Sequence, residues 1–373
     1  MNSAAEINNS TISNNTAILS GGGITNEGSQ LIAAGATISG NNVTGQFGRG
    51  GGIDNHLAST LTITNSAISN NSARDGGGIS SSSSSALTVT SSTISGNSGS
   101  QGGGIMSSDH STLTVANSTL SGNLVSPFQG GAIRNSGDAV NISSCTITGN
   151  SAPVNQFGSA GGIYNVSNVI TVKNSIVANN ANGDCFGSSG GSIVGLGINF
   201  STDGSCPGFT QVTPGQLNLG PLENNLGSTR THALLPGSVA IDAVIPPADC
   251  SDLSAMPATV TTDQRGKPRP ADGDANGIAW CDAGAFELQP CSVPCPATEI
   301  IGVVYNGINR LVIDGAHFGD NPSVIINGVD KTARIRFASD TEIVLKKKLG
   351  LATGLNKIEV KTSMGTASYN LVI

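Results

Sequence analysis

The sequence predicts an all-β protein, in which a right-handed parallel β-helix (a solenoid) is followed by a small immunoglobulin-like β-sandwich. Short apolar phrases recur through the first half of the chain with a period of about 26 to 30 residues, which is typical of a solenoid. Charged residues make up only 11% of the 373 residues and aromatic residues 3%, which is too little charge for a helical protein. Beyond about residue 297 glycine and serine become scarcer, and short alternating runs indicate a second β domain.

In the first repeated motif an asparagine stands three residues after an aliphatic residue, as in Ile94 and Asn97. One turn cannot bury its own apolar side chains, whereas stacked turns about 4.8 Å apart place like residues over like. The predicted inward column is Ile12, Ile38, Ile68, Ile94, Leu120, Ile147 and Ile176. The predicted ladder of hydrogen-bonded amides at a corner is Asn15, Asn41, Asn71, Asn97, Asn123, Asn150 and Asn179.

Two further sequence motifs recur once in each repeat. A glycine–isoleucine pair such as Gly104 and Ile105 follows a corner where the chain needs positive φ or a close approach. An alternating run such as residues 87–89 is typical of a half-buried strand. We therefore expect three short strands per turn, running parallel to their counterparts with right-handed crossovers. Low-complexity disorder is the alternative, but it lacks regularly placed isoleucine. Residues 46–47, 127–128 and 153–157 fall in longer turns and are expected to bulge from one edge.

Charge and cysteine content restrict the partners and the compartment. The net charge of −7 argues against nucleic acid as a partner, and no stretch is apolar enough for a transmembrane segment. Seven cysteines favour two or three disulfides and an extracellular or cell-surface location, with buried free thiols as the alternative. Spacing alone leaves the pairing open. Cys145 stands apart in a repeat, and the candidate disulfide cysteines are Cys185, Cys206, Cys250, Cys281, Cys291 and Cys295.

The chain begins inside a repeat. Met1 is followed almost at once by a coil, without a signal peptide or a polar cap. Repeat proteins need caps to stay soluble, so we expect a signal sequence and earlier coils to be missing from this N-terminus.

The repeats extend over residues 1–182, and residues 183–289 are predicted to form irregular terminal coils with a capping tail. This tail contains THALLPGSVAIDA at 231–243, DQRGKPRP at 263–270 and CDAGAFE at 281–287. These runs resemble the C-terminal region of the choice-of-anchor Q family of bacterial surface and secreted proteins. The resemblance implies a right-handed parallel β-helix and an exported protein.

Charged residues in the capping tail suggest an ionic clasp that ties the tail along the coil and covers its last turn. The participants would be Arg265, Lys267 and Arg269 with Asp263, Asp272, Asp274, Asp282 and Glu287. A carbohydrate or calcium site is the functional alternative, because Asp272, Asp274 and Asn276 alternate around a glycine as in a calcium loop. The closing bidentate glutamate is missing, which favours a structural loop. Calcium is the one cofactor considered.

The tail of the chain reads as a second module. Residues 290–296 are predicted to be a Pro/Cys-rich linker, and residues 297–373 a sandwich of seven short strands. The runs at 311–319, 324–328 and 356–360 resemble the IPT/TIG family. That resemblance implies a spacer or a binding platform.

The favoured function is a non-catalytic secreted or cell-surface scaffold, adhesin-like, that binds glycans or partner proteins. Polar ladders such as Thr62, Thr88 and Thr114 would offer the binding surface. A purely structural stalk is a close variant of this hypothesis.

The alternative is a polysaccharide lyase or glycoside hydrolase built on the β-helix. A hydrolase needs two or three carboxylates within about 5 to 9.5 Å. Asp75 and Asp109 fall at different repeat phases, and the turn between His56 and His110 carries no histidine. No catalytic residue is therefore predicted.

Overall fold

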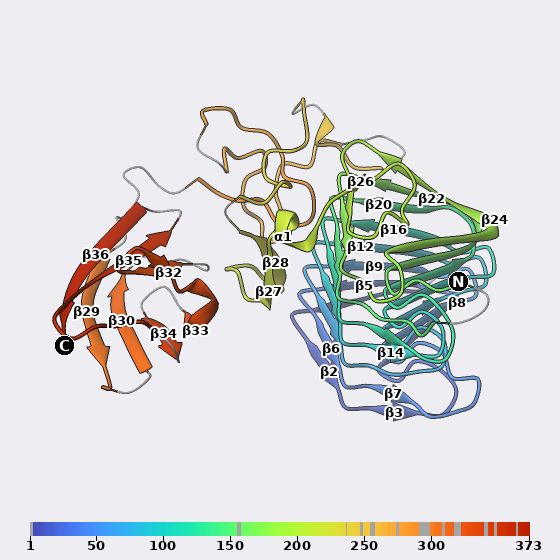
Figure 1. Cartoon of the computed structure of the whole chain (residues 1–373). Helices are drawn as coiled ribbons and strands as arrows, with labels where there is room; N and C mark the ends of the chain where they lie inside the picture. Colours follow the sequence, from blue (N-terminus) through green and yellow to red (C-terminus); the bar gives the residue numbers. More distant parts are fainter. Residues whose placement is uncertain are drawn as a thin grey trace. The chain divides into compact units, whose positions relative to one another are not determined.

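The computed structural model describes the whole chain except residues 1–2, 155–157, 236, 247–248, 254–257, 274–275, 291–298, 308–309, 317–321, 339–341, 347–348 and 363–364. It divides into two compact units (Figure 1). We call Met1–Gln289 the coil unit and Pro290–Ile373 the sandwich unit.

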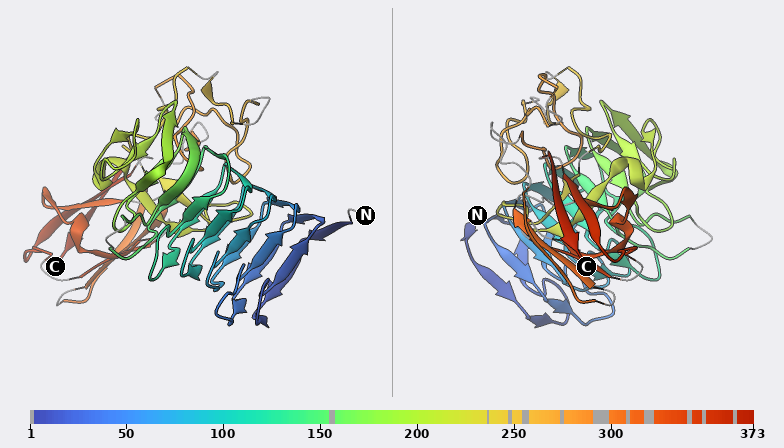
Figure 2. Two further views of the ribbon diagram at one scale, coloured as in Figure 1. Left: turned by 90° about the vertical axis from the view of Figure 1, so that its right-hand side faces the viewer. Right: turned by 60° about the vertical axis from the view of Figure 1, so that its left-hand side comes forward.

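The coil unit is a parallel β-solenoid, in which each strand pairs with the equivalent strand of the next turn (Figure 2). The first ladder contains the Gly-Ile strands β4 (Ile24–Glu27), β8 (Ile53–His56), β11 (Ile79–Ser81), β15 (Ile105–Ser108) and β19 (Ile133–Ser136). The second contains β1 (Ala4–Asn8), β5 (Gln30–Ala34), β9 (Thr60–Thr64), β12 (Ala86–Thr90), β16 (Thr112–Ala116) and β20 (Val140–Ser143). The long strands β22 (Ile163–Lys173) and β24 (Cys185–Leu196) run through both ladders and join them into one sheet.

The third ladder contains the Ile-x-x-Asn strands, and its members are β2 (Thr11–Ser13), β6 (Thr37–Ser39), β10 (Ala67–Ser69), β13 (Thr93–Ser95), β17 (Thr119–Ser121), β21 (Thr146–Thr148), β23 (Ile176–Ala178), β25 (Phe200–Ser201) and β26 (Thr210–Gln211). A fourth set of two-residue strands was not predicted, because two residues are too few to show alternation. It pairs β3 (Thr16–Ala17) with β7 (Asn42–Val43), and β14 (Ser98–Gly99) with β18 (Leu124–Val125).

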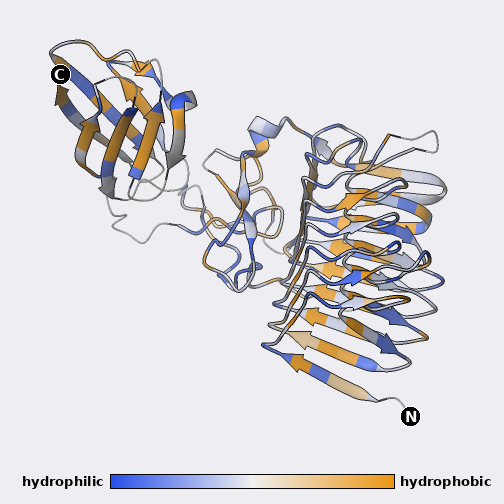
Figure 3. Cartoon of the chain, turned by 90° about the horizontal axis from the view of Figure 1, so that it is seen from below, coloured by the Kyte–Doolittle hydropathy of each residue, from blue (hydrophilic) through white to orange (hydrophobic). Residues whose placement is uncertain are grey.

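The inward columns form the core. Ile68, Ile94 and Leu120 lie over one another in register and are fully buried. Burying each aliphatic side chain is worth roughly 1.5–3 kcal/mol, and hydrophobic positions recur at equivalent places from turn to turn (Figure 3). The predicted all-β solenoid is confirmed.

The prediction that Ile176 is the last inward residue of the column is wrong by one position. Ile176 pairs with Thr146, and Val177 takes the inward place next to Ile147. Two aliphatic residues stand side by side here, so spacing alone did not identify the inward one. Ile176 instead packs outward against the capping tail.

The same shift corrects the amide ladder. Each side-chain Nδ2 donates to Oδ1 of the next amide at 2.9 to 3.0 Å, from Asn15 through Asn41, Asn71, Asn97, Asn123 and Asn150. The next acceptor is Asn180, not the predicted Asn179. Asn179 is exposed and has a left-handed backbone conformation, with φ of 57°.

The capping tail packs along the outer side of the third ladder. It contains the short helix α1 (Pro214–Leu217) and an antiparallel pair, β27 (Leu219–Glu223) and β28 (Thr231–Leu234). A second hydrophobic core forms here around Leu217, Leu234 and Phe286.

The ionic residues of the tail form two buried pairs. Arg265 Nη2 lies 2.7 Å from Asp263 Oδ2, and Arg269 Nε lies 2.8 Å from Glu287 Oε2. Between them, Gln264 Oε1 accepts a 2.6 Å hydrogen bond from the hydroxyl of Thr119 on the coil. The tail is therefore fixed to the side of the solenoid.

The sandwich unit has two antiparallel sheets. One contains β29 (Glu299–Tyr305), β30 (Arg310–Ala316), β34 (Glu342–Lys346) and β33 (Ile335–Ala338). The other contains β32 (Val329–Asp330), β31 (Ser323–Ile326), β35 (Leu355–Thr362) and β36 (Gly365–Val372). A 3₁₀ turn, η2 (Thr332–Arg334), precedes β33. Leu311, Ile313 and Val360 are among its fully buried core residues.

Candidate functional site

Unequal corner lengths create a groove on the outside of the coil unit. Arg49, Asp75 and Gln101 stack through consecutive backbone bridges, and each ends a corner. The corner before Arg49 spans residues 44–48, whereas a single residue, Arg74 or Ser100, forms each of the next two corners. The following corner is longer again, at residues 126–128. Two short corners between two longer ones leave an open hollow of about 610 Å³.

Small and polar residues form the floor of this groove, including Ser72, Ser98 and Ser100. The turns approach closely beside it because the glycine corner carries no side chains. A Cβ atom on Gly77 would clash with the carbonyl oxygen of Ser98. The groove therefore offers hydroxyl groups and backbone polar groups on a firm base.

The longer corners carry apolar side chains into solvent. Phe47 is 69% exposed and Phe128 43% exposed, and Leu124 on the groove wall is 48% exposed. Sugars have apolar C–H faces and hydroxyl edges, so exposed rings beside a hydroxyl-lined floor suit a carbohydrate.

Arg74 provides the positive charge of the groove. Its Cζ lies 5.3 Å from the centroid of the Phe47 ring, within cation–π range. Its Nε lies 3.9 Å from Asp75 Oδ1, and the same oxygen accepts a 3.1 Å hydrogen bond from Gln101 Nε2. Burial raises the pKa of Asp75, and attraction to Arg74, Arg134 and Arg49 opposes that rise.

A second polar cluster occupies the outer side of strand β8. The Asp54 carboxylate is fully buried, with its Oδ2 3.1 Å from His56 Nδ1 and 3.8 Å from Arg49 Nε. Burial raises the pKa of Asp54, and attraction to Arg49 and His56 opposes the rise. The imidazole is thus held by a buried acid while part of it reaches the surface.

The predicted polar ladder of Thr62, Thr88 and Thr114 lies on the second sheet ladder. The three residues are in register and half-buried on the outer face. His110 lies 3.4 Å from Asp138 at an exposed position, so His56 and His110 have different carboxylate partners.

Two disulfides fix the later part of the coil unit. They join Cys185 to Cys206 and Cys250 to Cys281. Cys145 is a buried free thiol, and Cys291 and Cys295 lie outside the described residues.

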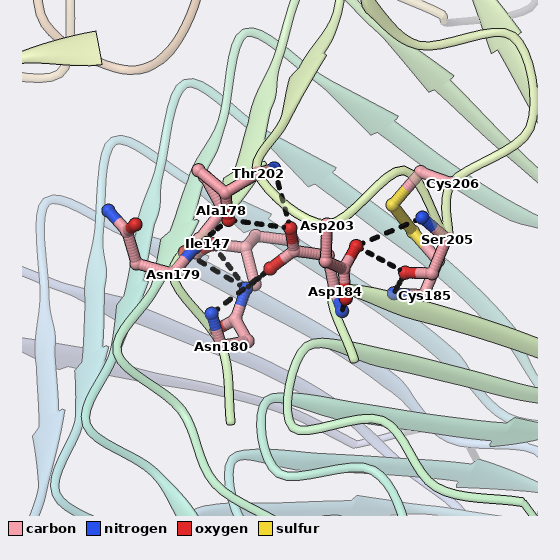
Figure 4. The surroundings of a disulfide bond; sticks show 10 residues. All are labelled: Ile147, Ala178, Asn179, Asn180, Asp184, Cys185, Thr202, Asp203, Ser205 and Cys206. Atoms are coloured by element: carbon pink, nitrogen blue, oxygen red, sulfur yellow. Dashed lines mark hydrogen bonds between the residues drawn. A yellow bond between two sulfur atoms is a disulfide. The ribbon is translucent and has the colours of Figure 1, made fainter. Parts of the chain in front are cut away.

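The first disulfide stands beside the end of the amide ladder (Figure 4). Asn180 Nδ2 donates to Asp184 Oδ1 at 3.0 Å, and the hydroxyl of Thr202 donates to Asp184 Oδ2 at 2.9 Å. Burial raises the pKa of Asp184. These bonds make Asp184 the terminal acceptor of the ladder, which is a structural role.

The calcium candidates lie in a tail loop. The Asp272 carboxylate accepts hydrogen bonds from the backbone N–H groups of Asn276 and Gly277, at 3.0 and 2.9 Å. Asp274 lies outside the described residues. Among the residues that the structure describes, no three His, Cys, Asp or Glu side chains gather as a metal site would require. The structural loop stays the favoured prediction, and calcium binding stays its alternative.

Sequence reasoning did not identify the groove. It expected bulges at 46–47 and 127–128, and these residues do lie in the flanking corners. The sequence does contain a signal for the groove, which is the contrast between long and single-residue corners. This contrast appears only when the two-residue strands of successive turns are aligned with one another.

The stacked ladders, the amide corner and the external groove define a parallel β-solenoid protein with a ligand-sized hollow on one edge. The profile of the family described as right handed beta helix region matches residues 1–120 and 36–201, more than half of the 373 residues together. The chain belongs to this right-handed β-helix family. No curated protein matches the chain. No helix in the described part of the chain is long and apolar enough to cross a membrane.

Proposed function

We propose that this protein is an exported, non-catalytic surface scaffold that binds a glycan in the groove of its coil unit. The main observation in support is the hollow over the single-residue corners at Arg74 and Ser100, with Phe47 exposed beside it. An aromatic face, an arginine and a row of hydroxyl groups are the polar and apolar groups that a sugar chain needs.

Two disulfides support an oxidising compartment. The choice-of-anchor Q resemblance of the capping tail supports a surface location. The sandwich unit, which resembles IPT/TIG modules, would act as a spacer or a second platform. Its two antiparallel sheets suit either role.

The test is a glycan array probed with the purified protein and with a Phe47→Ala, Phe128→Ala double variant. We expect binding that weakens about 2- to 10-fold per ring removed. Leu226→Ala is the matched control, because Leu226 is an exposed apolar residue of the capping tail. An array that gives no binding, or binding that the double variant leaves unchanged, contradicts the proposal.

Catalysis on a polysaccharide is the second candidate, and one observation favours it. The pair of Asp54 and His56 resembles the arrangement that orients a general base, and Arg49 adds a positive charge. Release of unsaturated uronide or new reducing ends, lost in His56→Asn, would establish this candidate. We expect neither product.

A further inference from the structure

We propose that the groove selects glycans that carry a carboxylate or sulfate group, and that Arg74 is the residue that recognises this charge. The inference rests on the proposed glycan binding and names the class of glycan. It follows from how Arg74 is held, from the local charge and from the spacing of the groove walls.

Arg74 is positioned before any ligand arrives. The Phe47 ring lies against its guanidinium, and the Asp75 carboxylate lies 3.9 Å from its Nε. Gln101 in turn holds Asp75. Fixing a long side chain in advance lowers the entropy lost on binding, which is the main cost of recruiting a flexible arginine.

The donors of Arg74 remain available to a ligand. Within the described residues, its guanidinium donates no hydrogen bond, and its side chain is 35% exposed where it lines the groove. A guanidinium edge offers two parallel N–H groups, and carboxylate and sulfate each offer two oxygens at the matching spacing.

Charge is sparse in the coils, yet it gathers at this edge. Arg49, Arg74 and Arg134 all act on Asp75, and only Lys173 adds another cation before residue 180. The whole chain carries a net charge of −7. Asp54 and Asp75 balance two of these three arginines, so this edge keeps one positive charge on a chain that is acidic overall, and that charge attracts an anion to the groove.

The groove is suited to a chain molecule. The two exposed phenylalanines stand on corners three turns apart, which at strand spacing is about 14 Å. A ligand lying along the solenoid axis would cross the hydroxyl floor and pass Arg74. An oligosaccharide with acidic sugars fits this arrangement, because it has apolar faces for the wall, negative charge for Arg74 and hydroxyl groups for the floor.

The experiment measures affinity by calorimetry for three probes: an oligogalacturonate, its fully methyl-esterified form and a carrageenan oligosaccharide, which carries sulfate but no carboxylate. The ester keeps the sugar backbone and removes the charge. We expect the acid to bind about 10-fold or more tightly than the ester, and raised salt to reduce this difference. Arg74→Gln should abolish the preference, so that the acid and the ester bind with equal affinity.

Arg74→Lys keeps the charge without the two-pronged edge and should retain only part of the preference. Arg310→Gln in the sandwich unit removes the same charge elsewhere and should have no effect. Thermal unfolding of each variant shows whether it is folded. The relative affinities of the carboxylate and sulfate probes identify which anion is recognised.

The outcomes separate this inference from the proposed function. Equal binding of acid and ester, or an Arg74→Gln variant that keeps the preference, overturns the inference and leaves glycan binding in place. A glutamate-rich peptide that competes as well as the acidic glycan also overturns it. No binding of any glycan, neutral or acidic, removes both.

Discussion

The side-chain oxygen of Asn123 accepts two hydrogen bonds from Asn97. The backbone N–H and the side-chain Nδ2 of Asn97 both donate to Asn123 Oδ1 at 3.0 Å. Asn97 Nδ2 also donates to the carbonyl of Ile68 in the preceding turn, at 2.9 Å. One buried amide thus links three successive turns, and this link repeats along the corner.

Replacing Asn97 with alanine should lower the free energy of unfolding by roughly 1–3 kcal/mol, because buried groups in two turns lose their partners. Urea denaturation followed by circular dichroism measures the change. The fold should survive, since the neighbouring amides remain bonded. A loss below about 0.5 kcal/mol would show that the ladder is not a source of stability.

Ile94→Asp should have a much larger effect and prevent the coil from folding. Ile94 is fully buried between Ile68 and Leu120, where a carboxylate has no partner. Ile94→Ala, the control, should cost about 2–5 kcal/mol through a cavity. Equal unfolding midpoints for Ile94→Asp and Asn97→Ala would contradict the stacked columns.

Cys145→Ser should change stability by no more than about 1 kcal/mol. Cys145 occupies a position that serine fills in other turns, and its Sγ lies 3.1 Å from the carbonyl of Ser143. Ser118 makes the equivalent 2.7 Å bond to the carbonyl of Ala116. A serine oxygen would reproduce that bond.

The same burial should protect the thiol from reagents. Burial raises the pKa of Cys145 to about 12, so little thiolate exists at neutral pH. Alkylation of the folded protein followed by peptide mapping should leave Cys145 unmodified. Rapid labelling without denaturant would show that the corner at Cys145 is accessible to the reagent and would contradict the burial of the thiol.

The buried carboxylates of the capping tail should make stability depend on pH. Burial and the charge of Glu287 raise the pKa of Asp282 well above its ordinary value. A raised pKa in the folded state stabilises the protein below the ordinary carboxyl pKa of about 4, and this stabilisation is lost as the pH rises. Asp282→Asn removes the group that titrates.

The measurement is urea unfolding at pH 4, 6 and 8 for both proteins. The stability of the parent protein relative to Asp282→Asn should be greatest at pH 4 and decrease toward pH 8. A difference that stays constant across this range, or that increases with pH, would contradict the raised pKa of Asp282.

The repeat architecture could be predicted because isoleucines at a fixed spacing are all buried only when successive turns stack on one another. The error at Ile176 and Asn179 arose where two aliphatic residues adjoin, so that either phase satisfies the local pattern. Only the capping tail, which covers Ile176, decides between them. Two ion pairs of the predicted clasp are present, Arg265 with Asp263 and Arg269 with Glu287.

Other features depend on contacts between residues far apart in sequence. Gln264 bonds to Thr119, 145 residues earlier, and no local pattern encodes that pairing. The groove was missed for a related reason. Arg74 is ordinary as a turn residue, and it becomes notable only when the corner of Phe47 lies over it.

Hydrogen–deuterium exchange, with and without a bound acidic oligosaccharide, tests the central claim that the groove is the ligand site. Ligand should slow exchange at residues 44–49, 72–76 and 98–101, which form the groove and its rim. Protection confined to the threonine face around Thr62 and Thr88, or to the sandwich unit, would place the ligand elsewhere and contradict the account.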